Sequence, residues 1–228
     1  MEILSESDWN ELKRKAENGD VHAMNEVAFW LRQGLKLNKL EIVKVDKKSS
    51  FQWTLKAFER GDLEATEQYA DYLTDKKNGV CEPNIELGIQ LYEKCMKHGS
   101  KRAAFCLGLE YRNKQQFEKA FQYYQAAQNE ENNFKELIIG QCYYYGIGVK
   151  KDKRKALEAL KSVDIENCTG YERDEANYLI GRIYLEGEAV EQNLNKARTY
   201  LELADKDGDH RSAQELLILI GRTDLLNA

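Results

Sequence analysis

The chain has 228 residues, of which 42% are hydrophobic and 32% are charged, with a formal net charge of -5. This balance is typical of a folded domain and not of a disordered chain. The mild acidity disfavours proteins that bind nucleic acid or an anionic membrane, because both require a basic surface. A single proline and the lack of a membrane-length apolar run indicate a helical protein that does not span a membrane.

The first predicted element is a helix around Trp9, Leu12 and Ala16. We expect this helix, within residues 1–20, to cap one end of the fold. The residues before it lack a basic segment followed by an apolar one, so the sequence predicts no secretory leader. We therefore expect a cytoplasmic protein, and five cysteines without a C-x-x-C spacing fit reduced, buried thiols in that compartment.

The next segments share a pattern in which a small residue and an apolar residue lie four positions apart. Because positions i and i+4 lie on one face of a helix, each pair predicts the first helix of a repeated unit. A further small residue follows in most units and would let a second helix approach closely. The pairs are Ala23/Val27, Ala65/Tyr69, Ala103/Leu107, Ala176/Ile180 and Ala213/Leu217, and the following small residues are Ala28, Ala70, Gly108, Gly140 and Gly181.

A turn and a second helix follow in each unit. Glycines 146, 148 and 187 are predicted to end first helices, because glycine adopts the left-handed conformation that other residues avoid. Four polar residues, Asp46, Asn84, Asp152 and Asn193, are predicted to cap the second helices. A glycine follows three of these caps by 15 residues, at Gly61, Gly99 and Gly208, and marks the second helix end. The connection from Gly34 to Asp46 is about six residues longer than its two clean counterparts.

Two segments carry the fullest motif. Residues 139–156 and 180–197 both fit apolar-Gly-x-x-Tyr-x-x-Gly-x-[Gly/Ala]-Val-x-x-[Asp/Asn]-x-x-Lys-Ala. This motif resembles the Sel-1-like repeat family, a relative of the tetratricopeptide repeat, over residues 5 to 221. The resemblance implies an all-α, right-handed superhelical solenoid of about six antiparallel helix pairs. It also implies a single domain over residues 1–228, closed by a capping helix within residues 209–228.

The same resemblance implies a non-enzymatic adaptor that binds another protein or a peptide in a concave groove. An assembly subunit or a toxin would be such a partner, and the alternative function is a bacterial immunity protein that occludes a toxin's active site. Aromatic and arginine side chains, which are enriched at binding hot spots, occur among the expected groove residues. By the tetratricopeptide layout these residues are Asn25, Phe29, Arg32, Glu67, Asp71, Phe105, Arg112, Tyr144, Tyr178 and Arg182.

Other constellations predict no catalytic, cofactor or metal site. Gly146-Ile147-Gly148 follows a helix and not a strand, so it is not expected to cradle phosphate. The three histidines, His22, His98 and His210, lie too far apart along a solenoid to share a metal. The basic run from residue 150 to 155 is interpreted as a solvated face. An enzyme would need a polar, partly buried cluster in the groove. We expect a monomer or a weak dimer.

Overall fold

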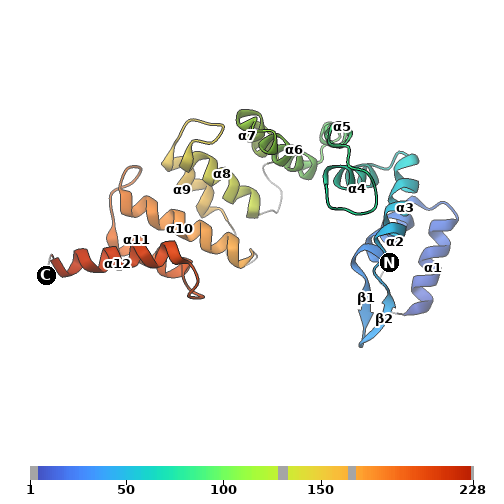
Figure 1. Cartoon of the computed structure of the whole chain (residues 1–228), viewed down its shortest axis with the longest axis horizontal. Coiled ribbons are helices and arrows are strands. Elements are labelled where there is room, and N and C mark those ends of the chain that lie inside the picture. The colour runs from blue at the N-terminus through green and yellow to red at the C-terminus, as the bar shows by residue number, and fades with distance from the viewer. Residues whose placement is uncertain (1–4, 128–132, 164–167, 227–228) are drawn as a thin grey trace. The chain divides into compact units, whose positions relative to one another are not determined.

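The computed structural model describes residues 5–127, 133–163 and 168–226, and these form twelve helices and one two-stranded hairpin (Figure 1). The chain divides into two compact units, residues 1–103 and 104–228. The first contains α1 (Glu6–Glu17), α2 (Val21–Gln33), β1 (Leu35–Leu37), β2 (Leu40–Val43), α3 (Lys47–Glu59), α4 (Leu63–Thr74) and α5 (Ile85–Lys97). The boundary falls within α6 (Lys101–Asn113), and the second unit continues with α7 (Phe117–Ala126), α8 (Asn133–Tyr145), α9 (Lys153–Lys161), α10 (Gly170–Glu186), α11 (Leu194–Ala204) and α12 (Arg211–Leu226).

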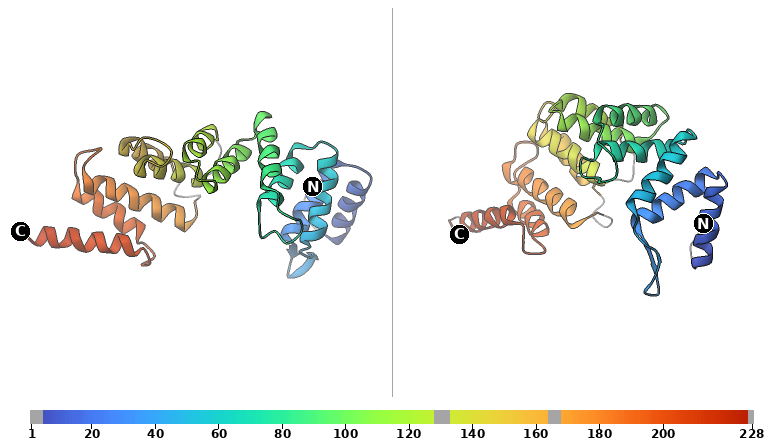
Figure 2. Two further views of the ribbon diagram at one scale, coloured as in Figure 1. Left: turned by 45° about the horizontal axis from the view of Figure 1, so that its top comes forward. Right: turned by 45° about the vertical axis from the view of Figure 1, so that its right-hand side comes forward.

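The helices are arranged as paired repeats, which confirms the all-α solenoid architecture. In the first unit α2 packs on α3 and α4 on α5, and in the second α8 packs on α9 and α10 on α11 (Figures 1 and 2). The helices α1 and α12 lie where the sequence predicts capping helices. The capping helix α1 packs against α2 and contributes Trp9, Leu12 and Ala16 to the core of the first unit.

The predicted helix caps are confirmed. The side chains of Asp46, Asn84, Asp152 and Asn193 each accept hydrogen bonds from backbone N–H groups in the first turn of the second helix. Each cap residue also donates its own N–H to a carbonyl in the last turn of the first helix. Asp46 bonds to Leu31 at 2.7 Å, and Asn193 bonds to Tyr184 at 3.0 Å. This bond closes the connection between the two helices of a repeat, whatever the number of residues between them.

The small residues of the first helices allow close helix packing, as expected. A Cβ atom at Gly140 would lie 2.6 Å from the Leu160 side chain, and one at Gly181 would lie 2.9 Å from Leu201. The turn glycine Gly148 has a φ of 68°, and a Cβ there would lie 2.0 Å from the carbonyl oxygen of Phe117. That separation leaves no room for any side chain at Gly148, so this turn packs directly against the start of α7.

The long connection between α2 and α3 folds as the β1–β2 hairpin. Asn38 and Lys39 form its two-residue turn with φ values of 50° and 70°, the positive pair that a type I′ turn requires. The strands are antiparallel, with Leu37 opposite Leu40, and β2 contacts α1. The hairpin therefore extends a repeat whose ends are still closed by the bond from Asp46 to Leu31.

Candidate partner-binding face

The ten predicted groove residues divide by burial. Three of them are buried, with exposed fractions of 5% for Asn25, 8% for Phe105 and 3% for Tyr144. Asn25 donates to Asp62, the N-cap of α4, and Phe105 packs against Tyr124, so both side chains serve the interior. The layout rule places these three outward, whereas the packing turns them inward and leaves them little surface for a partner. The other seven are partly or fully exposed: Phe29, Arg32, Glu67, Asp71, Arg112, Tyr178 and Arg182.

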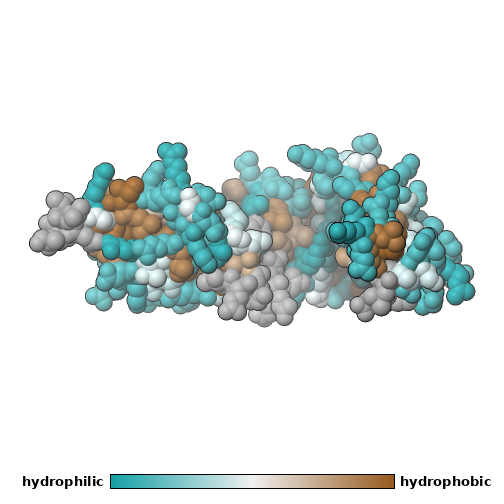
Figure 3. Space-filling model, turned by 90° about the horizontal axis from the view of Figure 1, so that it is seen from below, coloured by the Kyte–Doolittle hydropathy of each residue, from teal (hydrophilic) through white to brown (hydrophobic). Residues whose placement is uncertain are grey.

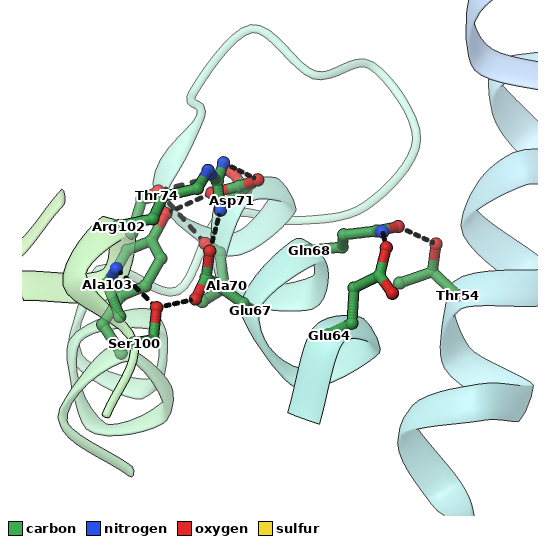
Figure 4. A network of polar contacts seen from close by, with 11 residues as sticks. Thr54, Glu64, Glu67, Gln68, Ala70, Asp71, Thr74, Ser100, Arg102 and Ala103 are labelled. Carbon is green, nitrogen blue, oxygen red and sulfur yellow. Dashed lines mark hydrogen bonds and ion pairs between the residues drawn. The ribbon is translucent and has the colours of Figure 1, made fainter. Parts of the chain in front are cut away.

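In the first unit the carboxylates of Glu67 and Asp71 are brought together but are already bonded within the chain (Figure 4). Arg102 forms ion pairs with both, including one of 2.6 Å to Asp71. Ser100 donates a hydrogen bond to Glu67, and Tyr92 donates one of 2.6 Å to Asp71. Because these acceptors are occupied, the two carboxylates stabilise the contact between α4 and the start of α6 and offer little to a partner's cation.

Arg32 lines a small polar cavity in the same unit. The cavity has a volume of about 260 Å³, and its walls also include Lys47, Asp71, Tyr72 and Asn78. Phe29, one helical turn before Arg32, is 41% exposed and contacts the edge of Trp30 with 5.1 Å between ring centroids. Phe29 and Arg32 therefore lie near the surface, but they do not form one contiguous site with Asn25, which is buried on the same helix.

In the second unit a buried polar network lies behind the surface of α8 and α10. Tyr144 donates a hydrogen bond of 2.7 Å to Glu186. Lys153 reaches the same carboxylate at 2.6 Å and that of Glu188 at 2.7 Å. Arg182 pairs with Glu186 at 2.9 Å. Because Lys153 is only 8% exposed, the interpretation of its basic run as a wholly solvated face is wrong at this position.

The network moves the pKa of each member away from neutrality. Burial and the hydrogen bond to Glu186 raise the pKa of Tyr144. Burial alone would raise the pKa of Glu186, but hydrogen bonds from Lys153 and Tyr144 and the nearby cations outweigh it and hold that pKa below its ordinary value. Burial would lower the pKa of Lys153, but its bonds to Glu186 and Glu188 raise it instead. All three groups therefore keep one protonation state near neutral pH.

An aromatic and arginine surface lies in front of this network. The guanidinium of Arg182 lies 5.3 Å from the ring centroid of Tyr144 and 5.8 Å from that of Tyr178. Tyr145 contacts the edge of Tyr144 and is 50% exposed. Gln141 donates to Glu175 at 3.3 Å, which links α8 to α10. We call this surface the α8–α10 face; it consists of Gln141, Tyr145, Glu175, Tyr178 and Arg182.

Of the five residues of this face, the predicted groove set contains Tyr178 and Arg182 and does not contain Gln141, Tyr145 or Glu175. The adjacent tyrosines 144 and 145 lie about 100° apart around a helix, and only one of them can point outward. The predicted layout exposed Tyr144, whereas the structure exposes Tyr145. Its place directly before the helix-ending Gly146 is the signal that could have identified it, because last-turn residues lie at the rim of a helix pair.

Two further surface features lie outside this face. Ile218 and Leu219 of α12 are 56% and 53% exposed, and apolar side chains gather at this end of the second unit (Figure 3). The other exposed feature is the hairpin of the first unit. Among the described residues no group of three or more histidine, cysteine or acidic side chains could hold a metal ion. No described helix is both long enough and apolar enough to cross a membrane.

The repeat geometry agrees with a family comparison. The Sel1 repeat profile matches residues 21–62, 64–95, 102–127, 137–158 and 174–209, well over half of the chain. The chain belongs to the Sel1 repeat family. The matched segments begin at or within the first helices α2, α4, α6, α8 and α10, so the repeats near Ala23 and Ala65 belong to the array.

Relatives of known sequence support the membership. The Sel1-repeat-containing protein YjcO of Escherichia coli is 27% identical over 213 residues, which cover 89% of this chain and 85% of that protein. Human protein sel-1 homolog 2 is 29% identical over 174 residues, which cover 73% of this chain. The match spans only 24% of the human protein, so the chain corresponds to about a quarter of it.

Solved structures support the fold. The structure of c5321, a protective antigen of uropathogenic Escherichia coli with an SLR fold, matches with a TM-score of 0.72 and 22% identity. That match covers 93% of this chain and 44% of c5321. A weaker likeness, with a TM-score of 0.48 and 20% identity, is to an immunity protein from Pseudomonas aeruginosa. At that level it carries no argument about the function of this chain.

Proposed function

We propose that this Sel1 repeat protein is a non-enzymatic module that binds a partner protein through its α8–α10 face. The observation that carries the proposal is the exposed Tyr145 beside Tyr178 and Arg182, whose guanidinium Glu186 holds over two tyrosine rings. Tyrosine and arginine are the residue types that contribute most at binding hot spots. An arginine that is already oriented loses less side-chain entropy when a partner docks on it.

The polar network behind the face favours a structural role over a catalytic one. A general acid or base works best with a pKa near the working pH. In this network the pKa values of Tyr144 and Lys153 are raised and that of Glu186 is lowered. All three pKa values are therefore shifted away from neutral pH, whereas acid–base catalysis requires a shift toward it. Their polar atoms are also bonded to one another. The network therefore supports the face by holding Arg182 and Tyr144 in place.

Narrower roles stay predictions. An adaptor within an assembly and an immunity protein that occludes a toxin's active site would both use the same face, and they differ only in the identity of the partner. The cytoplasmic location, the single domain over residues 1–228 and the monomeric or weakly dimeric state are likewise predictions from the sequence.

The test begins with identification of the partner. The tagged chain is purified from its native cell, the co-purifying proteins are identified by mass spectrometry, and the leading candidate is produced in pure form. Its dissociation constant is then measured by calorimetry for the wild type and for Tyr145→Ser/Arg182→Lys, with Leu203→Ser as control. Leu203 is 43% exposed on α11, so the control also removes an exposed apolar side chain, but one that is not among the five residues of the face.

We expect the face variant to weaken binding by about tenfold or more, as hot-spot truncations do, and the control to bind like the wild type. Thermal unfolding of each variant separates lost affinity from lost folding. Equal affinity of the folded face variant and the wild type would contradict the proposal.

A further inference from the structure

The segment that forms the hairpin has a charge opposite to that of the whole chain. Residues 32–48 contain six basic and two acidic residues, in a protein with a net charge of -5. Glu41, one of the two acidic residues, lies opposite Lys36 in the strand register. The other, Asp46, accepts the backbone N–H of Ser49 as the cap of α3, which lowers the pKa of its carboxyl. The segment therefore presents a local excess of positive charge.

Most of these cations are unpaired within the part of the chain that the structure describes. Lys36, Lys39, Lys44 and Lys47 are exposed, Arg32 is half-buried, and none of the five forms an ion pair, hydrogen bond or ring contact there. Some cations elsewhere are engaged, such as Arg102, which is bound to two carboxylates. Lys150 and Lys151 of the other basic run are exposed and also have no partner among the described residues. The hairpin thus keeps a set of cations available to an anionic partner.

A cavity with mainly apolar walls adjoins one of these cations, Lys44. It has a volume of about 450 Å³ and lies between α1, the end of α2 and the chain after β2. Trp9, Leu31, Ile42 and Val43 form its walls, and Val45, which is 49% exposed, lies with Lys44 at its edge. Asp46 also lines it, with its carboxylate bonded to Ser49. Seen from the side toward which the hairpin projects, the first unit has an apolar patch framed by hydrophilic side chains (Figure 3). This volume is large enough to take aliphatic side chains.

We propose that the hairpin surface binds an extended, acidic segment of a partner protein. The hairpin surface is defined as the cavity walls together with Lys36, Lys39 and Lys44. An aliphatic side chain of the segment enters the cavity, and its flanking carboxylates lie against the lysines. The inference rests on the proposed protein-binding role but not on the α8–α10 face.

The shape and composition of the surface favour a protein segment over other anions. A bilayer takes up protruding apolar groups. Leu40, which is 64% exposed beside the hairpin turn, is such a group, but Ile42, Val43 and Val45 line a hollow that a bilayer does not fill. A single-stranded nucleic acid requires exposed aromatic rings for base stacking, whereas residues 32–48 contain no aromatic residue and Trp9 in the cavity wall is only 6% exposed. An acidic peptide with aliphatic side chains satisfies both the charge and the cavity.

The test uses the full chain and a short fluorescein-labelled peptide in which glutamate alternates with valine and leucine. Binding is followed by fluorescence anisotropy for the wild type, Lys36→Gln/Lys39→Gln/Lys44→Gln and Val45→Ser. The matched control is Lys150→Gln/Lys151→Gln/Lys155→Gln, which removes the same charge from the other basic run. Two further peptides replace the aliphatic residues with serine or the glutamates with lysine, and a parallel sedimentation assay uses phosphatidylserine vesicles.

We expect the hairpin variant to weaken peptide binding by about tenfold and Val45→Ser by about threefold, with the control unchanged. The serine and lysine peptides should bind weakly or not at all. The inference is overturned if no peptide binds, if the hairpin and control variants weaken binding equally, or if only the vesicles bind. Tyr145→Ser/Arg182→Lys should leave peptide binding unchanged, so a failure here is distinct from a failure of the α8–α10 face.

Discussion

The two compact units are built from the same helix-pair repeat but differ in their connections and surfaces. In the second unit the connection after α8 is a tight glycine turn, and the charged side chain of Lys153 is buried behind an aromatic surface. In the first unit the equivalent connection after α2 expands into a hairpin, and the carboxylates of α4 are bonded to Arg102 at the surface. Both units nevertheless close each repeat with the same bond from the cap residue to the last turn of the first helix.

The difference shows which parts of the repeat are free to vary. The cap and its closing bond hold the second helix in place, so the residues between them can change in number without loss of the helix pair. The closing bond joins residues 143 and 152 in one repeat and residues 31 and 46 in another. Surfaces for partners can therefore arise in the connections as well as on the first helices.

The largest effect is expected from Gly148→Ala. The new Cβ would collide with the carbonyl of Phe117 and would also require a positive φ, so we expect unfolding to become easier by about 3 kcal/mol or more. Gly61→Ala in the first unit is the control. It has a φ of 80° but no atom within 4 Å of the added Cβ, so its cost should be only about 1 kcal/mol. Equal losses in urea unfolding would show that the turn does not pack directly against α7.

A smaller effect is expected from removal of the carboxylate that pairs with the buried Lys153. Glu186→Gln leaves the ammonium of Lys153, which is only 8% exposed, without its closest partner, so we expect a loss of about 2 kcal/mol. Glu67→Gln in the first unit removes a pair whose arginine is half exposed, so the loss should stay below about 1 kcal/mol. The comparison between the units would be wrong if Glu67→Gln cost as much as Glu186→Gln.

The same network predicts a pH dependence. Because the pKa of Glu186 is lower in the folded protein than its ordinary value of 4.5, its contribution is complete above that pH and is lost as pH falls through the folded pKa. The stability difference between the wild type and Glu186→Gln should therefore be constant near neutrality and shrink below about pH 4.5. Urea unfolding at a series of pH values measures it. A difference that grows on acidification has the wrong sign for this network.

The smallest effect concerns local opening of each unit. Burial raises the pKa of Cys95 in the first unit and of Cys142 in the second to about 11, so both thiols should react with alkylating agents only when their unit opens. In variants that keep only one of the five cysteines, we expect Cys142 to be labelled more slowly than Cys95, by about threefold, because the turn that follows its helix packs closely against Phe117 at Gly148. Faster labelling of Cys142 would reverse the ranking of the two units.

Sequence reasoning predicted the helix pairs well, because their caps and turns depend on local interactions. Caps such as Asp152 and turn glycines such as Gly187 act within a few residues, and their spacing alone identifies the helix pairs. The hairpin was left without a predicted conformation, since its two-residue turn is Asn38-Lys39 and not an Asn-Gly pair. Two of the five residues of the α8–α10 face, Tyr178 and Arg182, were among the predicted groove residues. The choice between Tyr144 and Tyr145 depends on where Glu186 lies, and that residue is 42 positions away.

The most direct test of the α8–α10 face is site-specific photocrosslinking in the native cell. A photoreactive phenylalanine analogue replaces Tyr145 in one version of the chain and Leu203, which is exposed to a similar degree on α11, in another. The account predicts a discrete crosslinked protein from position 145 and none from position 203. A crosslinked partner from position 203, with none from position 145, would contradict it.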